Sequence, residues 1–176
     1  NPDSAMNPQL TAGEIVAEPL RLNERLSERA LQARVGELME AVGLKATMAS
    51  RPPAEFSGGQ RQRLAIARAL ALSPRVIVAD EAVSALDVSV QAQILNLLNE
   101  LQQGLRISML FISHNLQVVR YMSHRIAVMY KGRIVELGPA EAVYRTPRHP
   151  YTEVLLAAIP STDPARRREA QTQRAT

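Results

Sequence analysis

Two short apolar runs with a helical pattern between them constrain the fold of this chain more than any other feature. Residues 76–79 read VIVA and residues 107–112 read ISMLFI, without a single charge. Continuous apolar runs of this length are typical of strands buried on both faces of a parallel sheet. Leucine and isoleucine recur at helical spacing between residues 94 and 101. The order strand, helix, strand predicts a βαβ unit, and therefore an α/β fold with parallel strands.

The residues before this unit have the pattern of a helical subdomain. Residues 11–14 read TAGE, a capping box that opens a helix, and Pro19 is expected to bend or end that helix. A second amphipathic helix is expected to begin near Ser27 and to end at Gly43. We therefore predict a mainly helical region over residues 1–75.

The residues after the unit predict a hairpin and short helices. Two strand-like runs between residues 126 and 137 are separated by the turn-forming pair Lys131-Gly132, and Gly-Pro and His-Pro pairs then open two short helices. We expect residues 76–160 to form the remainder of the sheet domain with this extension. Residues 161–176 are expected to be a disordered basic tail.

Charge and composition exclude several classes of protein. The net charge is +4, but the last twelve residues carry four arginines and one glutamate, which leaves 17 basic and 16 acidic residues in the other 164. A nearly neutral folded part lacks the basic face of a nucleic-acid-binding protein. The chain has no cysteine and only three scattered histidines, so thiolate catalysis is excluded and no metal-ligand spacing is present.

The segment SGGQRQRLAIARAL, residues 57–70, predicts a helix that starts at two glycines. Glycines at a helix start leave backbone N–H groups approachable, and the positive end of the helix dipole favours an anion there. Arg63 and Arg68 lie well along the helix and are expected to be solvated or ion-paired. The pattern predicts a phosphate-binding turn formed by Ser57, Gly58, Gly59 and Gln60.

Polar, reactive groups follow both predicted strands. Asp80 and Glu81 come directly after the first strand, and His114 follows the second. Ligands of open parallel sheets bind beyond the carboxyl ends of the strands. Because adjacent strand residues point in opposite directions, one carboxylate can hold a hydrated Mg²⁺ while the other orients or deprotonates a water molecule.

These motifs, taken together and in this order, resemble those of ATP-binding cassette (ABC) ATPases. Residues 56–60 look like the signature motif, residues 76–81 like the Walker B strand with its catalytic glutamate, residues 84–87 like the D-loop, and residues 113–114 like the switch histidine. Residues 149–151, His-Pro-Tyr, resemble the C-terminal motif of ATPases that serve oligopeptide, dipeptide, nickel or glutathione import. The resemblance extends over residues 1–160.

The resemblance implies a fold and a role for each site residue. The fold would be a P-loop NTPase (RecA-like) core, incomplete in this chain, with an N-terminal helical ABC subdomain. Asp80 would hold Mg²⁺ through water, Glu81 would polarise the attacking water, and His114 would contact the γ-phosphate. Ser57, Gly58 and Gly59 would contact the γ-phosphate of ATP held by a partner subunit. Gln60 would support the turn that these three residues form, and Asp87 would couple the two ATP sites.

The resemblance also implies cofactors and partners. ATP and Mg²⁺ would be bound between two ATP-binding subunits, in a homodimer or a heterodimer. Transmembrane permease subunits would bind the helical region, a solute-binding protein would act indirectly, and no nucleic acid would be bound. The subunit would be peripheral, on the cytoplasmic face of the inner membrane.

Two features depart from the family pattern. Ala82 stands where most members have proline, which should loosen the turn slightly without removing a reacting group. A phosphate-binding loop needs the pattern G-x-x-x-x-G-K-[ST], and neither Lys45 nor Lys131 follows such a loop. The chain therefore resembles the C-terminal portion of an ATPase domain, and it is expected to be inactive alone.

Two alternatives to an importer ATPase remain open from the sequence. One is a soluble ABC-type ATPase that acts in DNA repair or in translation. The other is a non-catalytic regulatory chain that naturally lacks its own phosphate-binding loop. The near-neutral folded part and the His-Pro-Tyr segment favour transport, and intact Glu81 and His114 argue against a regulator.

Overall fold

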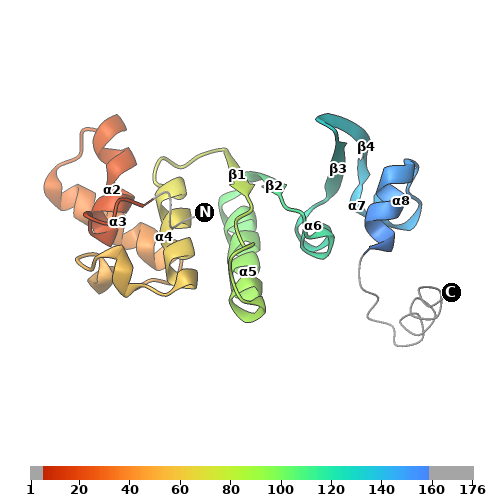
Figure 1. The fold of residues 1–176 in the computed structure, drawn as a ribbon. Helices are drawn as coiled ribbons and strands as arrows, with labels where there is room; N and C mark the ends of the chain where they lie inside the picture. Colours follow the sequence, from red (N-terminus) through yellow and green to blue (C-terminus); the bar gives the residue numbers. More distant parts are fainter. Residues whose placement is uncertain (1–5, 159–176) are drawn as a thin grey trace. The chain divides into compact units, whose positions relative to one another are not determined.

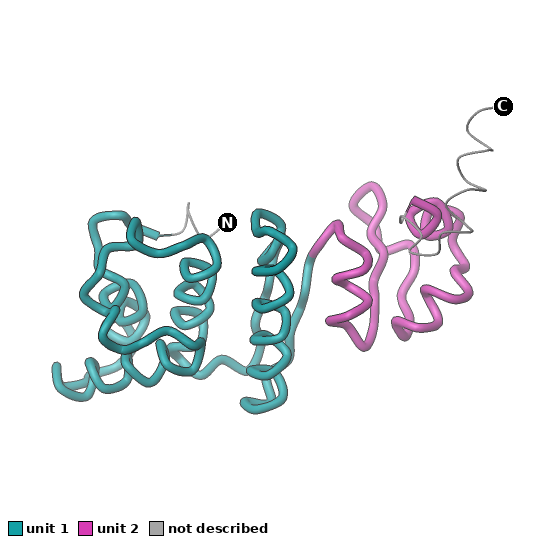
Figure 2. The backbone as a smooth tube through the Cα atoms, turned by 90° about the horizontal axis from the view of Figure 1, so that it is seen from below, with its two compact units in different colours: residues 1–112 teal, residues 113–176 magenta. Residues whose placement is uncertain are grey.

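The computed structural model describes residues 6–158 of the 176-residue chain. The chain divides into two compact units, residues 1–112 and residues 113–176 (Figure 2). The division falls at Ile112, the last residue of the second strand. The predicted tail at residues 161–176 lies outside the described residues.

Three helices form the N-terminal part of the first unit: α2 (Ala12–Asn23), α3 (Glu28–Ala41) and α4 (Gly58–Leu70) (Figure 1). Single 3-10 turns lie at Ala46–Met48 and Pro53–Glu55. The helices contact one another and bury a common apolar core. Its fully buried side chains include Ile15, Leu20, Met39 and Leu64.

The predicted ends of these helices are confirmed in most cases. Thr11 and Glu14 form the capping box of α2, and the Ser27 side chain accepts a hydrogen bond from the Ala30 amide at the start of α3. After α3, Gly43 adopts a left-handed backbone (φ 74°), which suits a residue without Cβ. Pro19 does not end α2, which continues to Asn23.

The predicted βαβ unit is present. Strand β1 (Val76–Asp80) pairs in parallel with β2 (Ser108–Ile112), and α5 (Val88–Leu105) connects them. The register runs from Val76 opposite Ser108 to Asp80 opposite Ile112, so both strands end at the same edge. The structure thus has the parallel α/β arrangement that the apolar runs predict.

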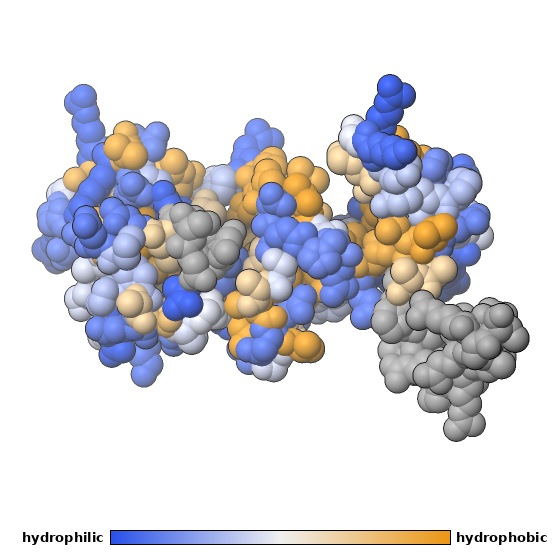
Figure 3. All heavy atoms as spheres, in the orientation of Figure 1, coloured by the Kyte–Doolittle hydropathy of each residue, from blue (hydrophilic) through white to orange (hydrophobic). Residues whose placement is uncertain are grey.

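The expectation that both strands are buried on both faces of the sheet is wrong for the first unit. Alternate side chains of the strands are exposed: Val76 by 59%, Val78 by 61%, Leu110 by 56% and Ile112 by 44%. Side chains alternate between the two faces of a sheet, and the packed face holds the buried Ala79. Hydrophobic surface gathers over the part of the first unit that holds β1 and α5 (Figure 3).

The second unit contains the predicted hairpin and short helices. Strands β3 (Arg125–Tyr130) and β4 (Arg133–Pro139) are antiparallel, with a register shift between Val128 and Met129. Lys131 (φ 48°) and Gly132 (φ 76°) form the turn, as predicted, because a tight hairpin needs positive φ values. The helices are α6 (Leu116–Met122), α7 (Ala140–Arg145) and α8 (Pro150–Ala157). Within residues 6–158, no helix combines the length and apolar character that crossing a membrane requires.

The core of the helical part predicts a stability difference between two leucines. Leu64 on α4 is fully buried, whereas Leu22 on α2 is 79% exposed. Leu64→Ala should lower the free energy of unfolding by about 2–5 kcal/mol, because it removes buried methyl groups and leaves a cavity. Leu22→Ala should change it by less than about 0.5 kcal/mol. Urea denaturation of both variants tests this, and equal losses would contradict the assigned core.

Candidate functional site

The start of α4 is held by two reciprocal hydrogen bonds between Ser57 and Gln60. The Ser57 amide donates to Gln60 Oε1 (3.0 Å), and the Gln60 amide donates to Ser57 Oγ (3.3 Å). The side chain of Gln60 therefore fixes the turn. The Ser57 hydroxyl acts as acceptor in this pair, so its O–H can still donate to another group.

The amides of Gly58 and Gly59 precede the hydrogen-bond ladder of α4. The first helical bond runs from the Arg61 amide to the Ser57 carbonyl (2.8 Å). Amides that lie before this bond point out of the helix start, where the helix dipole is positive. Two amides and the hydroxyl of the exposed Ser57 thus form a group of donors suited to an anion.

The arginines that follow the turn bind protein groups. Arg68 forms an ion pair with Glu18 of α2 (2.6 Å), as expected for a paired face. Arg63 differs from the expectation, since its Nη1 donates to the Val42 carbonyl (2.6 Å) at the end of α3. Arg61 Nη1 donates to the Phe56 carbonyl (2.6 Å) and braces the residue before the cap. The bonds of Arg63 and Arg68 hold α4 against the other helices.

Asp80 and Glu81 lie at the carboxyl end of β1. Asp80 is exposed and Glu81 is half-buried. The Glu81 amide donates to the Ile112 carbonyl of β2 (2.9 Å), and Glu81 has a left-handed backbone (φ 48°). Ser84 Oγ in turn donates to the Glu81 carbonyl (3.0 Å). The turn that carries Glu81 is therefore held on both sides, a role for Ser84 that the sequence did not indicate.

Asp87 is the N-cap residue of α5. Its Oδ1 accepts hydrogen bonds from the Val90 amide (2.9 Å) and from Ser89 Oγ (2.8 Å). The bond from the Val90 amide, followed by that from Ser89, lowers the pKa of the Asp87 carboxyl below its ordinary value. Asp87 is therefore an ionised residue held in one orientation at the start of α5.

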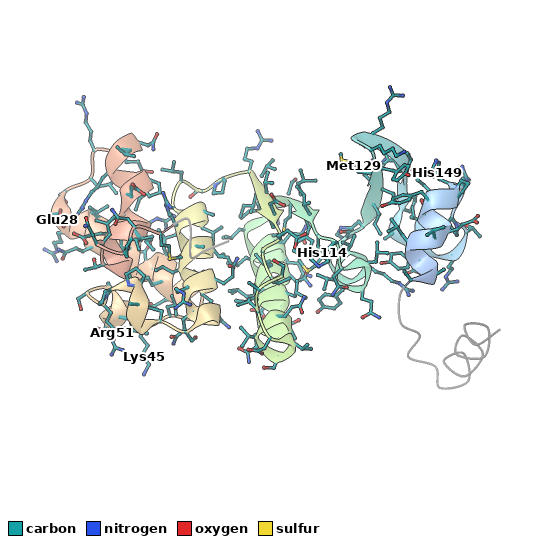
Figure 4. All side chains as sticks on the ribbon, in the orientation of Figure 1. Glu28, Lys45, Arg51, His114, Met129 and His149 are labelled. Carbon is teal, nitrogen blue, oxygen red and sulfur yellow. The ribbon has the colours of Figure 1, made fainter. Side chains whose placement is uncertain are left out.

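His114 follows Ile112, the strand residue opposite Asp80, by two positions (Figure 4). Its side chain is exposed, and it belongs to the second unit, whereas Asp80 and Glu81 belong to the first. The approach of His114 to the two carboxylates stays a prediction. Asn115 next to it caps α6 by accepting from the Gln117 and Val118 amides.

The donor set can be compared with what Mg²⁺ requires. Among residues 6–158, no three histidine, aspartate or glutamate side chains lie close enough together to hold a metal by themselves. Mg²⁺ at nucleotide sites usually takes only one or two carboxylates, with phosphate oxygens and waters as the other ligands. The exposed carboxylate of Asp80 fits a magnesium ion that arrives with a nucleotide.

The His-Pro-Tyr segment of the second unit is fastened to the hairpin by Glu136 of β4. The Glu136 carboxylate accepts hydrogen bonds from the Arg148 amide (3.0 Å) and the His149 amide (3.1 Å). The Thr152 hydroxyl contributes most to lowering the pKa of Glu136. The Tyr151 ring packs on Tyr130, with 4.1 Å between ring centroids. These contacts give the segment a structural role at the start of α8.

Two family models match the chain. The model described as ABC transporter matches residues 2–84, and the model described as oligopeptide/dipeptide transporter, C-terminal region, matches residues 135–176. Over these two regions the chain is similar to ABC transporter ATP-binding proteins. The matched regions include the signature turn and the Asp80-Glu81 strand end in the first case, and Glu136 with the His-Pro-Tyr segment in the second.

Relatives and a solved structure agree with this family. The chain is 61% identical over 168 residues to a probable peptide ABC transporter ATP-binding protein, y4tS, of Sinorhizobium fredii, which covers 96% of this chain and 48% of the relative. It is 55% identical to the glutathione import ATP-binding protein GsiA of Escherichia coli (strain K12), covering 96% of this chain and 27% of that protein. A dimeric structure of a post-hydrolysis state of the ATP-binding cassette MJ0796 bound to ADP and Pi superposes with a TM-score of 0.66, at 32% identity, over 77% of this chain and 59% of that chain.

These comparisons confirm the α/β cassette fold and the resemblance to peptide and glutathione import ATPases. They favour the importer reading over the two alternatives, a soluble ATPase and a regulatory chain. The chain spans about half the length of the first relative and about a quarter of the second. Nothing in them assigns a role to an individual residue, so the roles of the site residues remain proposals.

The cap of α5 predicts a measurable titration. The pKa of Asp87 is lowered in the folded chain, so its capping contribution is present above the ordinary aspartate pKa of about 3.9 and is lost as the pH falls through the lower folded value. The amide shift of Val90, followed by NMR against pH, should show a midpoint below about 3.9. Asp87→Asn should abolish this titration, and Glu100→Gln on the same helix should leave it unchanged. A midpoint at or above the ordinary value would contradict the cap.

Proposed function

We propose that this chain is the signature-bearing part of an ATP-hydrolysing subunit that powers an ABC importer for peptides or related small solutes. The observation that carries the proposal is the start of α4, where the reciprocal Ser57–Gln60 cap leaves the amides of Gly58 and Gly59 ahead of the helical ladder. Relatives that are peptide and glutathione import ATP-binding proteins support the substrate class.

The signature turn binds the terminal phosphate of ATP held by a second ATP-binding subunit. The Ser57 hydroxyl and the two glycine amides donate hydrogen bonds to phosphate oxygens, and the helix dipole adds about half a positive charge at this end. Such donors act on charge that develops on the transferring phosphoryl group. Because the donors are fixed by Gln60, they need no rearrangement when the nucleotide arrives.

The end of β1 provides the hydrolytic groups of the subunit's own site. Asp80 would hold a magnesium ion, which when bound would neutralise charge on the phosphates. Glu81 orients the attacking water and accepts its proton, a contribution of about 10²–10⁴ in rate for a well-placed base. His114 contacts the γ-phosphate, and Asp87 couples this site to the second one across the dimer.

A phosphate-binding loop has to come from residues outside the 176 present here, because the sequence contains no G-x-x-x-x-G-K-[ST] pattern. We infer that the working unit is a homodimer or heterodimer of ATP-binding subunits with transmembrane permease subunits. The helical part that contains α2 and α3 binds the permease and passes closure of the dimer on to it. The subunit acts on the cytoplasmic face of the membrane, and it binds no nucleic acid.

Substitution of the proposed base tests the function. In the subunit that joins this chain to a phosphate-binding loop, Glu81→Gln should lower phosphate release by about 10²–10⁴ while ATP stays bound in a closed dimer. Phosphate release and co-elution of ATP with the dimer measure the two effects. Glu100→Gln, which removes an exposed carboxylate from α5, is the matched control. Turnover near the control value would remove Glu81 from the mechanism.

Uptake by cells extends the same test to transport. Cells that lack the native subunit should recover uptake of labelled peptide with the wild-type gene and with Glu100→Gln, but not with Glu81→Gln. The subunit could hydrolyse ATP fully while the gene has no effect on uptake of peptide or glutathione. That result would overturn the importer assignment and leave the ATPase assignment standing.

The isolated chain is expected to be inactive. The purified 176-residue chain should show no magnesium-dependent phosphate release above a protein-free blank, because its sequence contains no G-x-x-x-x-G-K-[ST] loop to hold the phosphates of its own nucleotide. Steady hydrolysis that rises with chain concentration, and that Glu81→Gln abolishes, would show that a second phosphate-binding element exists in these residues.

A further inference from the structure

The start of α4 packs against the start of α5 within the first unit (Figure 1). The contact is closest between Gly59, the second residue of α4, and Val90, the third residue of α5. A Cβ placed on Gly59 would overlap the Cγ1 methyl of Val90, and it would lie 3.7 Å from Val90 Cβ and 3.9 Å from Val90 Cγ2. Gly59 therefore has no side chain partly because Val90 occupies that space.

The neighbouring glycine differs in this respect. A Cβ placed on Gly58 would lie 3.6 Å from Leu86 Cδ2, which is an ordinary van der Waals distance. The structure thus separates two glycines that are adjacent and identical in sequence. Of these two positions, only position 59 needs a glycine because of a contact with another side chain of the chain.

Val90 cannot easily move out of the way. Its backbone amide donates to Asp87 Oδ1 (2.9 Å), and the Asp87 carbonyl accepts from the Gln91 amide (2.8 Å). A β-branched side chain in a helix has one strongly preferred χ1 rotamer, so rotation of the methyl groups is also restricted. The position of the Cγ1 methyl is therefore tied to the Asp87 cap.

The other side of the contact is equally constrained. Ser57 and Gln60 hold the turn reciprocally, and Arg61 donates to the carbonyl of Phe56, whose side chain is 2% exposed. Two well-fixed helix starts therefore touch at the point where one of them lacks a Cβ. A shift of the Asp87 segment would press Val90 against the turn that carries Ser57.

We propose that Val90 is a positioning residue, which through its contact with the bare Cα of Gly59 sets the place of the phosphate-contacting turn relative to Asp87. The proposal rests on the proposed function, because it concerns the same turn. In this arrangement the signature turn and the segment ending at Asp87 move together. The absence of a side chain at position 59 then serves this contact as well as the approach of a nucleotide.

The first test uses the chain itself, without nucleotide, and measures unfolding in denaturant. Gly→Ala near a helix start normally favours the helix, so Gly58→Ala should be neutral or stabilising. Gly59→Ala should instead raise the unfolding equilibrium constant by about 5- to 100-fold, as expected for overpacking beside a stiff side chain. In the Val90→Ala background, Gly59→Ala should become neutral or stabilising. The same destabilisation in both backgrounds would overturn the contact.

The second test measures ATP hydrolysis by the complete subunit dimer. Gly59→Ala should reduce kcat by about 100-fold. A misplaced contacting group weakens stabilisation of the transition state more than it weakens binding of ATP. Adding Val90→Ala should return kcat to the level of Val90→Ala alone. Val88→Ala, at an 83% exposed position on the same helix, is the control and should behave as wild type.

Two results would separate the failures. The double variant could regain stability but not ATP hydrolysis. Position 59 would then lack a side chain only to let the nucleotide approach, and the positioning role of Val90 would be overturned. If the wild-type dimer hydrolyses no ATP, the proposed function fails, whereas the unfolding measurement still decides whether Val90 excludes a side chain at Gly59.

Discussion

The parallel register of β1 against β2 is the constraint on which the rest of the first unit depends. It places Asp80 opposite Ile112, and the Glu81 amide then donates to the Ile112 carbonyl (2.9 Å). This bond is made with a left-handed backbone at Glu81, a conformation that costs about 1–2 kcal/mol for a residue with a Cβ. Strain of this kind persists where surrounding bonds determine the geometry, and here Ser84 supplies one such bond. The strand end therefore fixes where the chain turns toward Asp87 and α5.

The starts of α4 and α5 each solve the same problem of unsatisfied amides, but in different ways. At α5 the Asp87 carboxylate accepts from Val90 and Ser89, so the charge of the cap is used within the chain. At α4 a neutral pair, Ser57 and Gln60, satisfies one amide each and adds no negative charge. A carboxylate in the place of Ser57 would repel a phosphate, whereas a hydroxyl can accept and donate at once. The difference suits α4, and not α5, to an anionic ligand.

The sequence predicted those parts that depend on neighbours along the chain. The βαβ order, the hairpin turn at Lys131-Gly132 and the start of a helix near Ser27 follow from local patterns, and the structure confirms them. The sequence missed what depends on distant residues. Val78 was expected to be buried and is 61% exposed, because apolar character does not reveal whether a second layer covers the sheet. The bond from Arg63 to the Val42 carbonyl and the contact of Gly59 with Val90 join segments far apart in sequence, and no local pattern encodes them.

Some charged residues build the fold, whereas others face solvent at the end of a strand. Glu136 shows the first kind, since its carboxylate is occupied by the Arg148 and His149 amides and its pKa is lowered chiefly by the Thr152 hydroxyl. Arg63 is similar, because its guanidinium closes the end of α3. Asp80 is exposed at the tip of β1, where a carboxylate without a structural task is available to a cation that accompanies phosphate. Ser57 lies between these two kinds, because its hydroxyl oxygen accepts from the Gln60 amide while its O–H remains able to donate, as the proposed contact with phosphate requires.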